Sequence, residues 1–194
     1  MMCGDVNSTE MPEPYTAAEA EASLITGEHL RMRAIGEPPL MRDLAPGRPV
    51  IWEVGVRADA PDPGGDLGLS GRGELAEIPG ALLVSVRSCS EPWSRGRCPI
   101  GAEELLGAES LDRIAHSAPT RHLTTMPSDE QCWLRIEVTL QKQPLQERPG
   151  AAGAEGDLLI HAVGSGEEVT TSPDGRRATP GVPAQGSQRG RRTT

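Results

Sequence analysis

The sequence predicts an α+β fold: a small, mostly antiparallel sheet with one or two helices, a marginal core, long Gly/Pro-rich loops and a disordered C-terminal tail. Apolar and polar residues alternate in 48–58 and 131–141, which is typical of half-buried strands, whereas 102–116 carries apolar residues at helical spacing. Only 36 of the 194 residues are Leu, Ile or Val and none is Phe, so the core must be thin. The order helix, strand, strand, helix, strand, strand favours antiparallel pairing.

Composition divides the chain into three parts. Residues 1–15 show no periodicity and are predicted to be a disordered leader. A single small domain is expected over 16–163, with loop insertions at 59–80 and 142–156, where glycine and proline are frequent. Residues 164–194 hold almost no branched aliphatic side chains and end in several arginines, which predicts a disordered basic tail.

The first helix is predicted at the start of the domain. Thr16 and Glu19 fit a capping box, in which the hydroxyl accepts a first-turn amide proton and the glutamate reaches back to the cap. Helix is therefore expected from 16 to 27, and a second helical stretch over 28–35 ends before Pro38.

Four strands are predicted from alternation. The first, 48–58, places Val50, Trp52, Val54 and Val56 on one face. The second is 81–88. The third, 131–141, has the clearest pattern, with one apolar and one solvated face, and the fourth, 157–163, is expected to pair with it as a long-looped hairpin.

The second helix is predicted over 102–116. Glutamates at its start and Arg113 and His116 at its end match the helix dipole. Its apolar stripe would consist of Leu105, Ala108, Leu111, Ile114 and Ala115.

Composition also disfavours several function classes. The net charge is −9 and no concentrated basic face appears in the apolar-rich region, so no nucleic acid is expected as a partner. No apolar run approaches the roughly 18 residues that span a bilayer, so no membrane is expected either. The few, irregularly spaced cysteines predict reduced thiols and a cytoplasmic or nuclear location. They are Cys3, Cys89, Cys98 and Cys132.

Metal and cofactor sites are not predicted. The possible zinc ligands do not include a pair about two to four residues apart, as structural zinc sites use. They are Cys89, Cys98, His116, His122 and Cys132. Gly164 and Gly166 follow a predicted strand, but two glutamates come next and would repel a phosphate, so these are interpreted as loop glycines. The same interpretation applies to Gly71 and Gly73, which follow no predicted strand.

No catalytic residue is predicted. Cys98 lies near Arg95 and Arg97, which could lower a thiol pKa, but an exposed loop thiol is the simpler interpretation. No serine lies in a G-x-S-x-G nucleophile turn.

Two linear motifs suggest partners. Arg48, Val50 and Trp52 resemble the basic-x-Val-x-aromatic peptide that docks on the catalytic subunit of protein phosphatase one, although the same residues begin the first predicted core strand. Ser172 and Thr179 lie in sequences that resemble proline-directed acceptors, and Thr179 also follows two arginines, as a basophilic kinase requires.

These observations favour a non-enzymatic intracellular regulatory or protein-interaction protein with a phosphorylatable tail. A small-ligand-binding or enzymatic domain is the first alternative, with a pocket beside His116, His122 or Cys132. The second is a poorly constrained isoform or alternative-frame product with no defined activity, because the composition fits a GC-rich frame under little selection.

Overall fold

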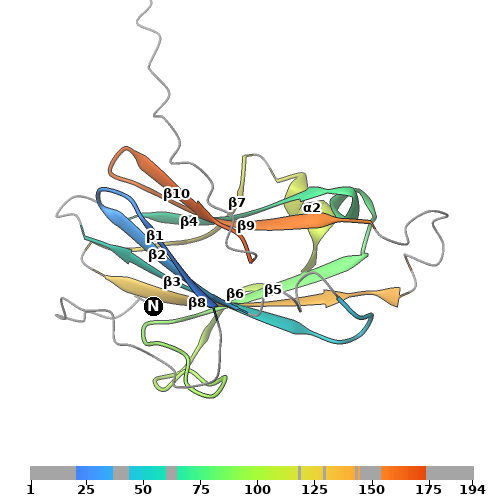
Figure 1. The fold of residues 1–194 in the computed structure, drawn as a ribbon, viewed down its shortest axis with the longest axis horizontal. Helices are drawn as coiled ribbons and strands as arrows, with labels where there is room; N and C mark the ends of the chain where they lie inside the picture. Colours follow the sequence, from blue (N-terminus) through green and yellow to red (C-terminus); the bar gives the residue numbers. More distant parts are fainter. Residues whose placement is uncertain are drawn as a thin grey trace, which may run out of the picture.

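The protein is a sandwich of two antiparallel β-sheets, not a mixed α+β fold (Figure 1). The computed structural model describes residues 21–36, 44–59, 65–117, 119–128, 130–142, 144 and 154–173. The expected fold class was wrong because five segments that resembled helix, loop or tail contain the strands β1, β2, β4, β6 and β10. None of the helices in the described part of the chain is long and apolar enough to cross a membrane.

The larger sheet has six strands in the order β1-β2-β3-β8-β5-β6. Each neighbouring pair is antiparallel, and β3 and β8 form its centre. The strands span Glu21–Thr26 (β1), Leu30–Gly36 (β2), Val50–Ala58 (β3), Gln131–Leu140 (β8), Leu82–Cys89 (β5) and Glu103–Ser110 (β6).

The smaller sheet has four strands in the order β10-β9-β4-β7. A 3-10 helix, η1, follows β4, and a short helix, α2, follows β6 and packs against β4 and η1. The bounds are Asp66–Gly73 (β4), Glu74–Glu77 (η1), Leu111–Ala115 (α2), Arg121–Thr125 (β7), Gly156–Gly164 (β9) and Glu167–Thr171 (β10).

The main hydrophobic core of the described residues lies between the two sheets. Alternate residues of the strands point inward, and burying each large aliphatic side chain contributes about 1.5–3 kcal/mol. Its fully buried members include Leu30, Met32, Trp52, Val54, Val56, Leu67, Leu69, Leu134, Ile136 and Ile160.

The strands predicted from alternation are confirmed, but one pairing is wrong. The segments 48–58, 81–88, 131–141 and 157–163 correspond to β3, β5, β8 and β9. However, β9 pairs with β4 and β10 in the other sheet rather than with β8. The hairpin prediction failed because the two strands lie in different layers.

The predicted helix over 28–35 is wrong, and so is the C-terminal part of the helix over 16–27. Residues 21–26 and 30–36 form the hairpin β1–β2 at one edge of the larger sheet. In β2, Leu30, Met32 and Ala34 are buried while Arg31 is exposed, which is the period of a strand. Pairing with β3 overrides the helix propensity of these residues. Thr16 and Glu19 lie outside the described residues.

The predicted helix over 102–116 is mostly strand. Residues 103–110 form β6, which pairs with β5 through irregular register shifts, and only 111–115 are helical. Leu111 and Ile114 are buried as the helical stripe predicted, because α2 covers one end of the core. The N-terminal half of the predicted stripe, Leu105 and Ala108, lies instead in the edge strand β6. The backbone of this strand pairs with β5 and forms no helical hydrogen bonds.

Two segments expected to lack regular structure contain strands. β4 lies within the loop predicted at 59–80, and β10 lies within the tail predicted from 164. The turn before β10 uses Ser165 (φ +50) and Gly166 (φ +80), so these residues form a tight hairpin turn rather than a flexible loop. Residues 174–194 lie outside the described part.

Candidate functional site

The candidate site is a disulfide-closed hairpin between β5 and β6. Cys89, the last residue of β5, is bonded to Cys98, with a Cα–Cα distance of 5.8 Å. We call residues 89–98 the capping hairpin. The prediction of reduced thiols is wrong for this pair. After β5 ends at Cys89 the chain turns back, which brings Cys98 within bonding distance of Cys89. The spacing of the two cysteines in the sequence had not indicated that they form a pair.

The tip of the capping hairpin is a two-residue turn. The N–H of Ser94 donates to the carbonyl of Arg97 and the N–H of Arg97 donates to the carbonyl of Ser94, both at 2.9 Å. Arg95 (φ +48) and Gly96 (φ +74) are the central residues, and positive φ at both positions is the geometry of a type I′ turn. A non-glycine residue in this region costs about 1 kcal/mol or more, so the surrounding bonds hold Arg95 in place.

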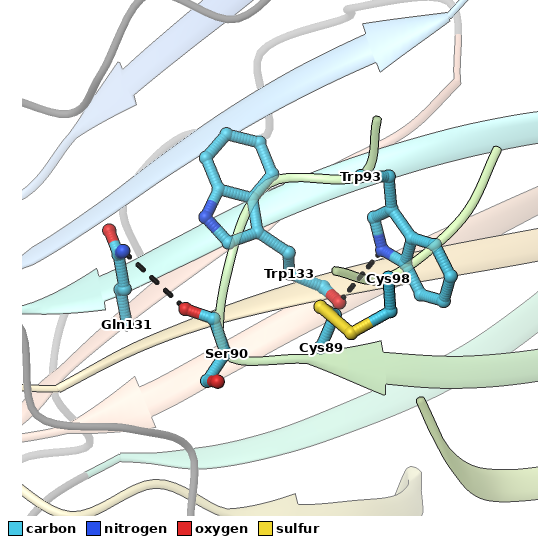
Figure 2. The surroundings of a disulfide bond; sticks show 6 residues. All are labelled: Cys89, Ser90, Trp93, Cys98, Gln131 and Trp133. Atoms are coloured by element: carbon cyan, nitrogen blue, oxygen red, sulfur yellow. Dashed lines mark hydrogen bonds between the residues drawn. A yellow bond between two sulfur atoms is a disulfide. The ribbon is translucent and has the colours of Figure 1, made fainter. Parts of the chain in front are cut away.

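Trp93 anchors the capping hairpin to the larger sheet (Figure 2). Its side chain is 3% exposed, and its indole Nε1 donates to the carbonyl of Trp133 on β8 at 3.1 Å. The guanidinium carbons of Arg87 and Arg135 lie 6.0 and 5.6 Å from the Trp93 ring, within cation–π range. The loop therefore covers a face of β8 that the sequence predicted to be solvated, and Trp133 is buried beneath it.

The sheet under the capping hairpin is adapted to hold it. Gly55 on β3 lies opposite Trp133, and a Cβ at this position would come within 2.8 Å of the indole ring. Arg135 pairs with Glu53, with 2.5 Å between Nη1 and Oε1. Burial raises the pKa of the Glu53 carboxyl, and the adjacent Arg135 opposes this effect.

The tip itself points to solvent. Ser94, Arg95 and Arg97 are exposed, and Ile100 just beyond the disulfide is 61% exposed. Two guanidinium groups at one end of a closed loop can make paired hydrogen bonds to carboxylates. The hairpin is thus a basic, ordered projection on a chain of net charge −9.

The predicted phosphatase-docking residues lie in the sandwich. Arg48 is exposed just before β3, whereas Val50 is 7% exposed and Trp52 is fully buried in the core. β3 pairs with β2 on one side and β8 on the other. Docking of Val50 and Trp52 would require β3 to leave the sheet, so these two residues serve the core in this fold.

The structure describes one of the two predicted phosphorylation residues, Ser172. Ser172 follows β10 and is 5% exposed, so a kinase would reach its hydroxyl only after this end of the strand opens. Thr179 lies outside the described residues. Phosphorylation at both positions stays a prediction.

The remaining candidates are dispersed. Cys132 is buried in β8, His116 ends α2 and His122 lies on β7. Among the described residues, no group of three or more His, Cys, Asp or Glu side chains is arranged to hold a metal ion. Gly71 and Gly73 belong to β4, and Gly73 (φ +92) ends that strand at η1.

The capping hairpin as a unit was not predicted from the sequence. The available signal was Arg-Gly at the turn, flanked by serine and arginine and enclosed by two cysteines nine residues apart. Nothing in the local sequence around Trp93 indicates that this residue contacts β8.

Comparison with known proteins shows no established family. No family model and no curated protein sequence matches the chain. Several solved structures are weakly similar, including the following two. AvmM, which catalyses macrocyclization in alchivemycin A biosynthesis, is 10% identical with a TM-score of 0.36, over 77% of this chain and 78% of AvmM. A family 123 glycoside hydrolase from Clostridium perfringens is 9% identical with a TM-score of 0.32, over 78% of this chain and 26% of the hydrolase. Both scores are too low to support an inference.

Proposed function

We propose that this chain is a protein-interaction module that presents the capping hairpin to an acidic surface of a partner protein. The observation that carries the proposal is the closed geometry of the hairpin: a disulfide at its base and a paired two-residue turn at its tip, with Arg95 and Arg97 exposed. A loop already held in one conformation loses little entropy when it binds.

The anchoring of the hairpin supports this role. Trp93 is buried against Trp133, so the tip is attached to the rigid sandwich and not to a mobile segment. Recognition loops are commonly held by a rigid scaffold in this way. Within residues 89–98 the only acidic residue is Glu91, so the two tip arginines give the hairpin a net positive charge.

The disulfide also bears on where the module acts. Disulfides persist in oxidising environments and are rare in cytosolic proteins. We therefore propose an oxidising compartment in place of the cytoplasm or nucleus expected from the sequence.

The test compares partners captured by the full chain and by two charge variants. The variant R95A/R97A removes both tip guanidiniums, and R113A/K142A removes two exposed cations elsewhere. We expect captured partners whose cross-links map to residues 94–97, and at least about a tenfold lower yield with R95A/R97A alone.

Two results would contradict the proposal. One is an equal yield with R95A/R97A and with the control variant, while the disulfide and the unfolding temperature stay unchanged. The other is a set of reproducible partners whose cross-links lie away from the hairpin.

A further inference from the structure

A serine, an imidazole and a carboxylate form a hydrogen-bonded relay on the smaller sheet, whereas the capping hairpin belongs to the larger sheet. Ser70 Oγ lies 2.7 Å from Nε2 of His161, and Nδ1 of His161 lies 2.7 Å from Oε1 of Glu168. Thr170 Oγ1 lies 3.4 Å from the same Nδ1. In the neutral imidazole, Nδ1–H donates to Glu168 because the carboxylate only accepts, and Nε2 is left to accept the Ser70 proton.

Strand register brings the three side chains together. β9 lies between β4 and β10, with Gly68 opposite His161 and Glu168 opposite Val163. Ser70 and Glu168 are thus diagonal neighbours of His161 on the two flanking strands, within reach of long side chains. Ile160 and Ala162 are buried in the core, so His161 between them points to the outer face.

The relay is sheltered but open on the serine side. The His161 side chain is 14% exposed and that of Glu168 is 44% exposed. Gly68 puts no side chain beside the imidazole, and a Cβ there would lie 2.9 Å from Thr120 Oγ1. The described pairing of β4 with β7 ends at Leu69, so Ser70 is the first residue beyond it, with only β9 paired alongside.

We propose that Ser70 is a nucleophile that carboxylic esters acylate, with His161 as its general base and Glu168 as the residue that positions the imidazole. A hydroxyl becomes nucleophilic when an adjacent base takes its proton, and a third group that orients the base completes the arrangement. All three parts are present at hydrogen-bonding distance on three adjacent strands.

The chemistry balances with water as the second reactant. Ser70 Oγ bonds to the ester carbonyl carbon while its proton moves to Nε2 of His161. The carbon–alkoxy bond then breaks, and the leaving alkoxide takes that proton and departs as an alcohol. Water attacks the acyl-serine and gives a proton to Nε2, and Ser70 Oγ recovers it as the carboxylic acid leaves.

The test uses the full chain with two probes, p-nitrophenyl acetate and a fluorophosphonate that labels activated serines. We expect a stoichiometric burst of p-nitrophenolate and a covalent adduct that peptide mapping places on Ser70. Ser70→Ala should abolish both signals, and His161→Gln should slow labelling by about 100-fold or more. Ser85→Ala, on the larger sheet, is the control and should label like the natural chain.

Glu168 needs a readout that separates positioning from stability. Glu168→Gln should slow labelling of Ser70, and Glu168→Asp should restore part of the rate, while the thermal unfolding curves of the two variants coincide. A chain that unfolds cooperatively yet gives no adduct on Ser70, or labels equally after Ser70→Ala, would overturn the proposal and leave the relay a structural contact between strands. The result is independent of partner capture by the hairpin.

Discussion

The carboxylate of Glu167 ties the two sheets together at one edge, and its removal is the sharpest test of this fold. Glu167 begins β10, and its two oxygens accept the backbone N–H groups of Glu28 and His29 in the turn between β1 and β2 and of Leu30 at the start of β2. Gly27 allows the approach, because a Cβ there would lie 2.4 Å from Oε2. Glu167→Ala leaves three turn amides without this acceptor.

The expected loss follows from the number and exposure of these bonds. A hydrogen bond to a charged group contributes about 1.5–3 kcal/mol net. The three share one half-buried side chain, and water can replace the contact to the exposed Glu28, so we expect a loss of about 2–4 kcal/mol for Glu167→Ala. This corresponds to about 5–15 °C in unfolding temperature. Glu167→Gln should lose less, since its carbonyl still accepts.

The assay combines urea unfolding, followed by tryptophan fluorescence, with native-state amide exchange. The exchange of Glu28, His29 and Leu30 amides should accelerate more than that of β8 amides, because the opened turn is local. Glu103→Ala removes an exposed carboxylate from β6 and should change stability by less than about 0.5 kcal/mol.

Equal stability of Glu167→Ala and Glu103→Ala would refute the reasoning. So would unchanged exchange at the three turn amides, because it would mean that another group protects them.

Three further predictions concern the larger sheet. Replacing Cys89 and Cys98 by alanine should lower the free energy of unfolding by about 2–3 kcal/mol, as expected for a disulfide that closes so short a loop. Alkylation of all four cysteines in the absence of a reductant would contradict the disulfide bond. Gly55→Ala should lower the free energy of unfolding by about 1–3 kcal/mol and shift Trp133 fluorescence. The control is Gly107→Ala on β6, where an added Cβ meets no tight contact. Similar effects of the two substitutions would show that the indole is not packed on Gly55. Burial raises the pKa of Glu53 above 4.5, so the folded state binds this proton more tightly than the unfolded state does. The contribution of Glu53 to the free energy of unfolding therefore falls as the pH rises from 4.5 through the folded pKa. Glu53→Gln should reduce this dependence of the free energy of unfolding on pH, measured by urea titrations at a series of pH values. An unchanged pH dependence would assign the effect to other groups.

Alternation was the reliable signal in this chain. It located β3, β5, β8 and β9, because an antiparallel strand with one buried face leaves a period of two in the sequence. It failed at β2, where the same period is present but 28–35 was expected to be a second helical stretch after the helix over 16–27. It also failed at β4, where three glycines hide the pattern that Leu67 and Leu69 carry.

Neither functional proposal could be reached from sequence spacing. Ser70, His161 and Glu168 are separated by 91 and 7 residues, and only the register of β4, β9 and β10 makes them neighbours. The tip turn of the capping hairpin is local and could have been predicted from Arg95 and Gly96. Its attachment through Trp93 to Trp133 could not, because it joins residues 40 apart in sequence.

The sequence by itself determined the central strands and the absence of a long apolar run, since each depends on a short repeating pattern or on composition. The tertiary structure alone decided that helix-like segments become edge strands, that β8 and β9 lie in different sheets, and that Cys89 meets Cys98. These outcomes depend on pairing between distant segments, whose free energy exceeds the fraction of a kilocalorie per residue by which local propensities differ.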